Sequence, residues 1–126
     1  MSPKILTIDD SKMVHLIVAK TFETFDCQIV SAADGALGVE AALREKPDLI
    51  FLDITMPVLN GIQTLEKIRG TPEIAGTPVV MLTAESDAQR LGAADALKVS
   101  GYISKPFKPA QLVELTKSLV NLQAKA

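Results

Sequence analysis

Five polar side chains in the sequence could together bind a metal ion and a phosphoryl group. Each of them stands at or just after the end of a short segment that could form a strand: Asp9, Asp10, Asp53, Thr83 and Lys105. Three carboxylates with no His or Cys among them form an all-oxygen ligand set, which suits Mg²⁺ or Mn²⁺ rather than zinc. A divalent cation, an ammonium group and a hydroxyl around a nucleophilic carboxylate are the groups that phosphoryl transfer requires.

Asp53 is the residue around which we expect this site to be built. Residues 49–52 are continuously apolar, as in a strand that is buried on both faces of a parallel sheet. Such a strand has no structural reason to end in an acid unless the acid emerges at the carboxyl edge of the sheet, where open α/β proteins bind ligands. We therefore predict that Asp53 attacks a phosphoryl donor in line and becomes an acyl phosphate on the protein itself.

The other polar residues also have purely structural explanations. Asp10 or Ser11 could cap the helix that follows, since either side chain can accept from a free backbone N–H group. Thr83 could cap a helix or occupy a turn, and Lys105 could be a solvated lysine beside a turn proline. Because all four strand ends are polar in a matching way, we favour a shared functional site over four separate structural explanations.

Five apolar segments of strand length alternate with five segments of helical periodicity. The predicted strands are residues 4–8, 28–32, 49–52, 78–82 and 101–104, and the predicted helices are residues 11–25, 34–44, 60–70, 86–97 and 109–122. Alternation of this kind predicts an α/β fold, a five-stranded parallel sheet with helices on both faces. The flavodoxin-like strand order 2-1-3-4-5 would bring the ends of the first and third strands, and thus the three carboxylates, into one crevice.

The predicted helices differ in how clearly they mark a buried face. In the second helix we expect Val39, Ala42 and Leu43 to point inward, and the last helix carries a leucine stripe from Leu112 to Leu122. The fourth helix is rich in alanine and has a weak apolar face. We therefore expect the fourth helix to be the least tightly packed of the set.

Composition limits the class of protein. The 126 residues are 48% hydrophobic and 22% charged with a net charge of -2, which predicts a single soluble domain spanning residues 1–126 and no binding to nucleic acid or to a membrane. No apolar run reaches the roughly 20 residues of a membrane span, and the amino terminus lacks the pattern of a signal peptide. One cysteine, Cys27, fits a reducing compartment. We expect a cytoplasmic protein.

Four motifs in the sequence resemble those of the receiver domains of two-component response regulators, of the single-domain (CheY-like) type. They are IDDS at residues 8–11, DITMP at 53–57 with Gly61 further on, MLTA at 81–84 and YISKPF at 102–107. The resemblance covers nearly the whole chain, and the four motifs in this order and spacing are specific although each alone is weak. It implies a signalling phosphoacceptor of a phosphorelay rather than a turnover enzyme.

The resemblance also implies how the acidic residues act. Asp53 would be phosphorylated from a sensor histidine kinase or a histidine phosphotransfer protein. Asp10 would ligate Mg²⁺ directly and Asp9 largely through water. Asp53 and the backbone carbonyl of Thr55 would complete the protein ligands. On this analogy the side chains of Thr55 and Glu85 would border the phosphoryl group and tune its hydrolysis.

The resemblance further implies a switch that reports the state of Asp53. Thr83 and Lys105 would bind the phosphoryl oxygens, with a cis peptide between Lys105 and Pro106. Tyr102 would be exposed in the resting state and would pack inward once Thr83 moves toward the phosphoryl group. The surface of the fourth helix, fifth strand and fifth helix would then bind a target protein that the sequence does not identify, in a monomer or a weak dimer.

The chain departs from the family pattern at several positions. Lys98 and Val99 stand where many members have Gly and Ala, which would alter the packing beneath the switch. His15 stands where many relatives have Arg, and the sequence assigns it no role.

Two other classes of protein use a similar site or the same architecture. A phosphatase of the haloacid dehalogenase type also uses an Asp nucleophile with Mg²⁺, but it needs an acid two residues later, where this chain has Thr55. A nucleotide- or flavin-binding module of the same architecture would want a glycine- or hydroxyl-rich loop after the first strand, and Asp9-Asp10-Ser11 is acidic there. Both alternatives fall behind the phosphoacceptor hypothesis.

Overall fold

Five parallel strands form one sheet in the computed structural model, which describes residues 2–54, 60–83, 91–105 and 107–125. The strands are β1 (Lys4–Ile8), β2 (Gln28–Ala32), β3 (Leu49–Asp53), β4 (Val79–Thr83) and β5 (Gly101–Ser104). Their order is β2-β1-β3-β4-β5, so the predicted topology is confirmed. Asp53 and Thr83 are the last residues of their strands rather than the first residues after them.

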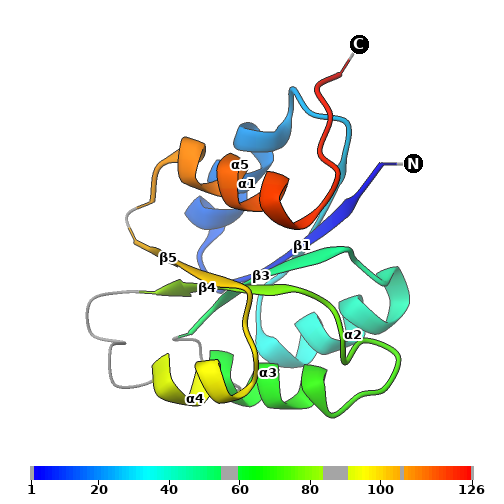
Figure 1. Ribbon diagram of the computed structural model, residues 1–126, viewed down its shortest axis with the longest axis vertical. Coiled ribbons are helices and arrows are strands. Elements are labelled where there is room, and N and C mark those ends of the chain that lie inside the picture. The colour runs from blue at the N-terminus through cyan, green and yellow to red at the C-terminus, as the bar shows by residue number, and fades with distance from the viewer. Residues whose placement is uncertain (1, 55–59, 84–90, 106, 126) are drawn as a thin grey trace.

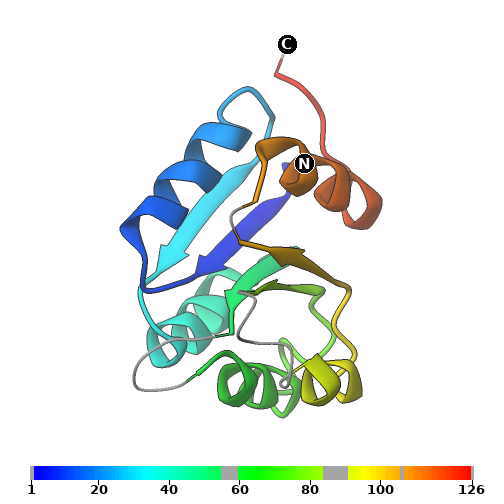
Figure 2. The same cartoon turned by 90° about the vertical axis from the view of Figure 1, so that its left-hand side faces the viewer.

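Helices cover both faces of this sheet (Figures 1 and 2). They are α1 (Lys12–Phe22), α2 (Gly35–Glu45), α3 (Gly61–Arg69), α4 (Leu91–Ala96) and α5 (Pro109–Leu119). In both views α1 and α5 lie on one face, and α2, α3 and α4 lie on the other. The predicted start of the fourth helix near residue 86 lies outside the described residues. None of the helices in the described part of the chain has the length and apolar character that a membrane span requires.

The core consists of two apolar layers separated by the sheet. Alternate residues of the strands point into opposite layers: Phe51 and Leu82 pack against α1 and α5, whereas Leu52 and Met81 pack against α2 and α3. Every residue of β3 and β4 is buried, which accounts for the continuous apolar sequence of these two strands. The buried strands β3 and β4 therefore place their last residues, Asp53 and Thr83, at the same edge of the sheet.

Helix α2 packs through small residues, of which the sequence predicted only Ala42. Leu43, predicted to face inward, is 36% exposed, whereas Gly38 and Ala42 are buried. A Cβ atom added to Gly38 would lie 2.5 Å from Cδ1 of Ile8, so α2 approaches β1 too closely for a large side chain at this position. With Gly38 and Ala42 facing the sheet, Leu43 lies on the outward-facing side of the helix.

The carboxyl-terminal segment corrects two further helix predictions. Helix α5 ends at Leu119, so Leu122 is buried from an extended tail rather than from the helix. The backbone N–H of Asp26 donates to the Gln123 carbonyl (2.7 Å), and Phe25 forms an antiparallel bridge with Ala124. The tail thus pairs with the segment that follows α1, and α1 ends at Phe22 rather than at residue 25.

Gly61 lets the start of α3 lie directly against the end of β3. The Gly61 N–H donates to the Ile54 carbonyl (2.7 Å), and a Cβ atom on Gly61 would overlap the Asp53 carbonyl oxygen. Backbone cannot move aside as a flexible side chain can. The side chain of Asn60 caps the helix by accepting from the Gln63 N–H (2.9 Å), which fixes this approach.

Replacing Gly61 by Ala is therefore expected to lower the free energy of unfolding by about 2–3 kcal/mol, as overpacking against rigid neighbours does. Gly92→Ala is the matched control, because a Cβ atom there meets no atom of the described residues within 4 Å and alanine suits a helix better than glycine. Urea denaturation of both variants measures the difference. Equal stabilities of the two variants would contradict the proposed close approach.

Candidate functional site

Three carboxylates meet at the carboxyl edge of the sheet. Asp9 follows β1, Asp10 follows Asp9, and Asp53 ends the neighbouring strand β3. One carboxylate oxygen from each residue can be chosen so that all three atoms lie within 4.8 Å of one another. Asp9 and Asp53 are buried and Asp10 is exposed, so the cluster opens to solvent on the Asp10 side. The structure therefore brings the predicted acidic residues together.

Lys105 supplies the positive charge of the cluster. Its Nζ lies 3.1 Å from Asp9 Oδ2 and 3.1 Å from Asp53 Oδ1, bridging the two buried carboxylates. Burial alone would lower the pKa of the ammonium group, but the two carboxylates outweigh burial and raise the pKa of Lys105 above its usual value. The Lys105 N–H also donates to the Thr83 carbonyl (2.6 Å), which places the lysine beside the end of β4.

Asp9 is held in place from several directions. Its backbone N–H donates to the Ala32 carbonyl (3.1 Å), and its Oδ1 accepts from the Ser11 N–H (2.9 Å). Asp9 Oδ2 is buried, and among the described residues its polar partner is the Lys105 ammonium group at 3.1 Å. A buried carboxylate oxygen with this remaining capacity, in an all-oxygen donor set, fits a divalent cation such as Mg²⁺.

Thr83 ends β4 and Tyr102 lies on β5, the two strands that come after β3 in the sheet. Thr83 is 6% exposed and pairs in register with Ser104 of β5. Tyr102 is half-buried against the layer that contains α3 and α4, so it is not the exposed side chain that was expected. Thr55, Glu85 and Pro106, to which the family resemblance gave roles, lie outside the described residues.

The hydroxyl of Tyr102 donates to the Asp95 carboxylate of α4, a contact that the sequence did not predict. Burial, and then Asp95, raise the pKa of Tyr102 to about 12. The sequence pattern does not predict this contact, because it depends on the conformation of the turn that connects α4 to β5. Lys98 in that turn has a φ of 59°, a left-handed conformation that glycine adopts without strain.

Arg69 ties the same turn to the body of the protein. From the end of α3 its Nε donates to the Leu97 carbonyl (2.8 Å) and its Nη1 to the Thr77 carbonyl (2.8 Å). A third bond joins Nη2 to the Lys98 carbonyl (3.3 Å). The side chain of Arg69 therefore fixes the end of α4, and with it the position of Asp95.

His15 makes a second contact that the sequence did not predict. Its Nε2 lies 2.7 Å from the backbone carbonyl oxygen of Asp9, and the ring is half-buried on α1. A lone histidine on a helix gives no sequence signal for such a bond.

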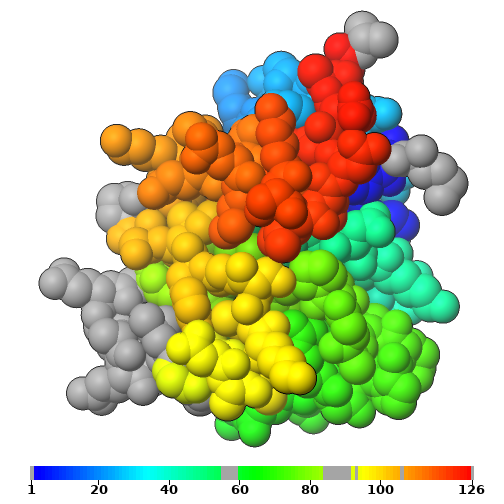
Figure 3. Space-filling view, in the orientation of Figure 1, coloured from blue at the N-terminus to red at the C-terminus, as the bar shows by residue number. Residues whose placement is uncertain are grey.

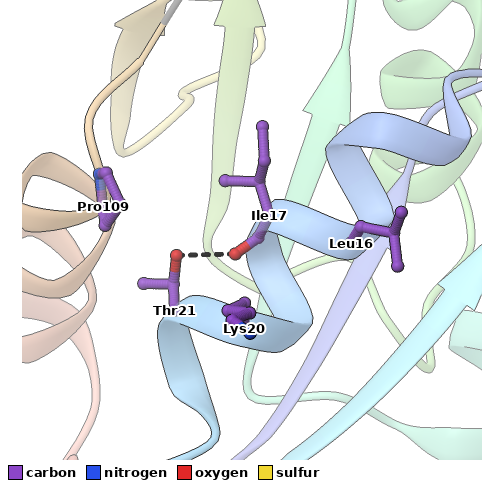
Figure 4. Close-up of a pocket in the computed structure, with 5 residues that line it drawn as sticks. All are labelled: Leu16, Ile17, Lys20, Thr21 and Pro109. Carbon is purple, nitrogen blue, oxygen red and sulfur yellow. Dashed lines mark hydrogen bonds between the residues drawn. The ribbon is translucent and has the colours of Figure 1, made fainter.

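A separate hollow of about 470 Å³ lies between α1 and the start of α5 (Figure 4). Its lining residues are Leu16, Ile17, Lys20, Thr21 and Pro109. The Thr21 hydroxyl donates to the Ile17 carbonyl (2.6 Å), so this polar group is satisfied within the helix. Among the residues that the structure describes, Asp9, Asp10, Asp53, Thr83 and Lys105 do not line the hollow, which is therefore distinct from the acidic cluster.

Comparison with known proteins assigns the family. The model of the response regulator receiver domain matches residues 5–117. Protein PilG of Pseudomonas aeruginosa is 29% identical over 117 residues, which are 93% of this chain and 87% of PilG. The alkaline phosphatase synthesis transcriptional regulatory protein PhoP of Bacillus subtilis is 30% identical over 120 residues, 95% of this chain and 49% of PhoP.

A solved structure of the Vibrio cholerae chemotaxis protein CheY4 matches with a TM-score of 0.88 at 28% identity, covering 95% of this chain and 100% of that one. The chain spans about half the length of the first curated relatives that it matches. The match of the family model over most of the chain, with the same fold in a chemotaxis protein, identifies this chain as a member of the response regulator receiver domain family.

Proposed function

We propose that Asp53 is the phosphoacceptor of a two-component phosphorelay, and that residues 1–126 form one receiver domain. The observation that carries this proposal is the ammonium group of Lys105, which bridges Asp9 and Asp53 at 3.1 Å in the middle of the acidic cluster. A cation at this point can pair with the anionic group that arrives at Asp53. The donor is a sensor histidine kinase or a histidine phosphotransfer protein.

The residues of the cluster divide the work of the transfer, and Asp53 acts both as a metal ligand and as the nucleophile. Asp9, Asp10, Asp53 and the backbone carbonyl of Thr55 would hold Mg²⁺ or Mn²⁺, which when bound neutralises charge on the phosphoryl oxygens. A carboxylate oxygen of Asp53 forms the new bond to phosphorus as the bond from phosphorus to the donor's imidazole nitrogen breaks. Lys105 and the Thr83 hydroxyl bind the phosphoryl oxygens. The product is a signal on the protein, which slow hydrolysis removes.

Chelation of the metal ion tests this division of roles. With acetyl phosphate and Mg²⁺, intact-mass spectrometry is expected to show addition of one phosphoryl group. With excess EDTA the rate should fall on the order of 10²-fold, because charge stabilisation by the metal contributes several kcal/mol. Equal rates with Mg²⁺ and with EDTA would contradict a metal-dependent site.

The state of Asp53 is read on the surface of α4, β5 and α5, which lie next to one another on the face shown in Figure 3. Tyr102 joins two of these elements, because its hydroxyl group is bound to Asp95 of α4. We propose that movement of Thr83 toward the phosphoryl group breaks this bond and lets the ring turn inward. A target protein, or a second copy in a weak dimer, then binds the altered surface.

The bond between Tyr102 and Asp95 can be tested by titration, since Tyr102 is the only tyrosine in the chain. In Asp95→Ala the pKa of Tyr102 is expected to fall from about 12, although burial still holds it above 10. Asp95→Asn is the control that keeps an acceptor oxygen and removes the charge. Absorbance of the phenolate between pH 9 and 13 gives both values.

The raised pKa also predicts the direction of the pH dependence of stability. The folded chain keeps the phenol proton of Tyr102 to about pH 12, whereas the unfolded chain loses it near pH 10. The protonated tyrosine therefore contributes to the free energy of unfolding. This contribution is complete below pH 10 and is lost as the pH rises toward 12. The loss should be smaller in Asp95→Ala. An identical titration of wild type and Asp95→Ala would show that the contact does not act on Tyr102.

A further inference from the structure

His15 contacts the acidic cluster through the backbone of Asp9. The distance from His15 Nε2 to the Asp9 carbonyl oxygen is 2.7 Å, and a carbonyl oxygen can only accept a hydrogen bond. Nε2 must therefore carry a proton and donate it. The other ring nitrogen, Nδ1, is buried and has no hydrogen-bond partner among the described residues. The contact thus selects the ring tautomer that has its proton on Nε2.

The bond from His15 holds the Asp9 carbonyl oxygen, a part of Asp9 that the other cluster contacts of the described residues do not hold. The backbone N–H of Asp9 is bound to Ala32, and its carboxylate is bound to Ser11 and paired with Lys105. The carbonyl oxygen belongs to the peptide group that joins Asp9 to Asp10. Because a peptide group is planar, a fixed oxygen also fixes the N–H and the Cα position of Asp10.

We propose that His15 is a positioning residue for the acidic cluster, an inference that rests on the proposed metal-dependent function. By orienting the peptide between Asp9 and Asp10, it holds the exposed carboxylate of Asp10 where it can bind the cation together with Asp53. Asp10 is the exposed member of the cluster, so its direction depends most on the backbone that carries it. Groups that orient metal ligands typically change metal affinity by about 10- to 100-fold.

Three substitutions separate the hydrogen bond from the volume of the ring. His15→Gln places an amide N–H group near the position of Nε2, His15→Asn places one near the position of Nδ1, and His15→Leu removes the donor. Mn²⁺ is the probe, and the electron paramagnetic resonance signal of free Mn²⁺ gives the dissociation constant without any phosphoryl transfer. Thermal unfolding of the metal-free variants is measured in parallel.

The expected result is a dissociation constant for Mn²⁺ that rises about tenfold in His15→Asn and His15→Leu and stays near the wild-type value in His15→Gln. A role in packing alone would instead change thermal stability and leave the Asn and Gln variants alike in affinity. If His15→Leu does not fold, the comparison of Asn with Gln decides. Unchanged affinity in His15→Asn, or equal losses in Asn and Gln, would overturn the inference.

The failure of this inference can be told apart from the failure of the proposed function. If the wild-type chain binds Mn²⁺ with the predicted dependence on His15 but takes up no phosphoryl group, the phosphoacceptor proposal fails and the role of His15 stands. If the wild-type chain is phosphorylated at Asp53 and His15→Asn binds Mn²⁺ as wild type does, the role of His15 fails and the phosphoacceptor proposal stands.

Discussion

An Asp53→Asn variant is expected to take up no detectable phosphoryl group from acetyl phosphate, a loss of more than about 10³-fold in rate. The amide of Asn has nearly the shape of the carboxylate, but it is a poor nucleophile and cannot form the acyl phosphate. The fold should survive the change, because Lys105 keeps its ion pair with Asp9 at 3.1 Å. Intact-mass spectrometry after incubation with acetyl phosphate and Mg²⁺ measures the uptake.

Asp26→Asn is the matched control for this variant. Asp26 lies between α1 and β2, at the opposite edge of the sheet, and its carboxylate accepts from the Ser2 hydroxyl (2.7 Å). The Asp26→Asn variant should take up the phosphoryl group at the wild-type rate. Uptake in Asp53→Asn equal to that of the control would remove Asp53 from the role of phosphoacceptor.

A Lys105→Met variant is expected to lose phosphorylation while it keeps its affinity for the metal. Removing the ammonium group takes away one donor to the phosphoryl oxygens, which typically slows a reaction by about 10²–10³-fold. The same group repels a cation that binds Asp9 and Asp53, so the dissociation constant for Mn²⁺ should stay equal or fall. This opposite effect on rate and affinity distinguishes Lys105 from a metal-binding residue.

Loss of Lys105 should also destabilise the fold, because Asp9 and Asp53 are left buried without their cation. We expect the free energy of unfolding to fall by about 1–2 kcal/mol. This is less than the loss of a fully buried pair would cost, because the lysine side chain is 27% exposed. The pKa of Lys105 is raised in the folded state, so this contribution is complete below about pH 10.4 and is lost as the pH rises further.

Urea denaturation of Lys105→Met at pH 7 and at pH values above 10 measures the contribution. Lys105→Arg is the control that keeps the charge but not the compact ammonium group, so it should retain stability and still transfer slowly. Wild-type rates in Lys105→Met would contradict the proposed contact with the phosphoryl group.

The acidic cluster could be predicted from the sequence because strand continuity and strand order fix it. A continuous apolar run such as residues 49–52 indicates a strand buried on both faces, and the alternation of strands with helices leaves few possible topologies. Once β1 and β3 are neighbours, Asp9 and Asp53 must approach each other at the same edge. No knowledge of side-chain conformation is needed for that step.

The contacts that were missed depend on geometry that periodicity does not contain. Leu43 was expected inside together with Val39 and Ala42, but helix α2 faces β1 through Gly38 and leaves Leu43 36% exposed. The bond of Tyr102 to Asp95 depends on the left-handed conformation of Lys98 in the intervening turn. The bond of His15 to a backbone carbonyl involves a group that every residue carries, so no residue type marks it in the sequence.

The role of Asp53 as phosphoacceptor is tested most directly by locating the phosphoryl group on the chain. Sodium borohydride reduces an aspartyl phosphate to homoserine, and peptide mass spectrometry then identifies the residue that was modified. After incubation with acetyl phosphate and Mg²⁺ we expect homoserine at position 53 alone, and almost none when EDTA replaces Mg²⁺. Homoserine at position 9 or 10, or equal amounts at position 53 with and without Mg²⁺, would contradict it.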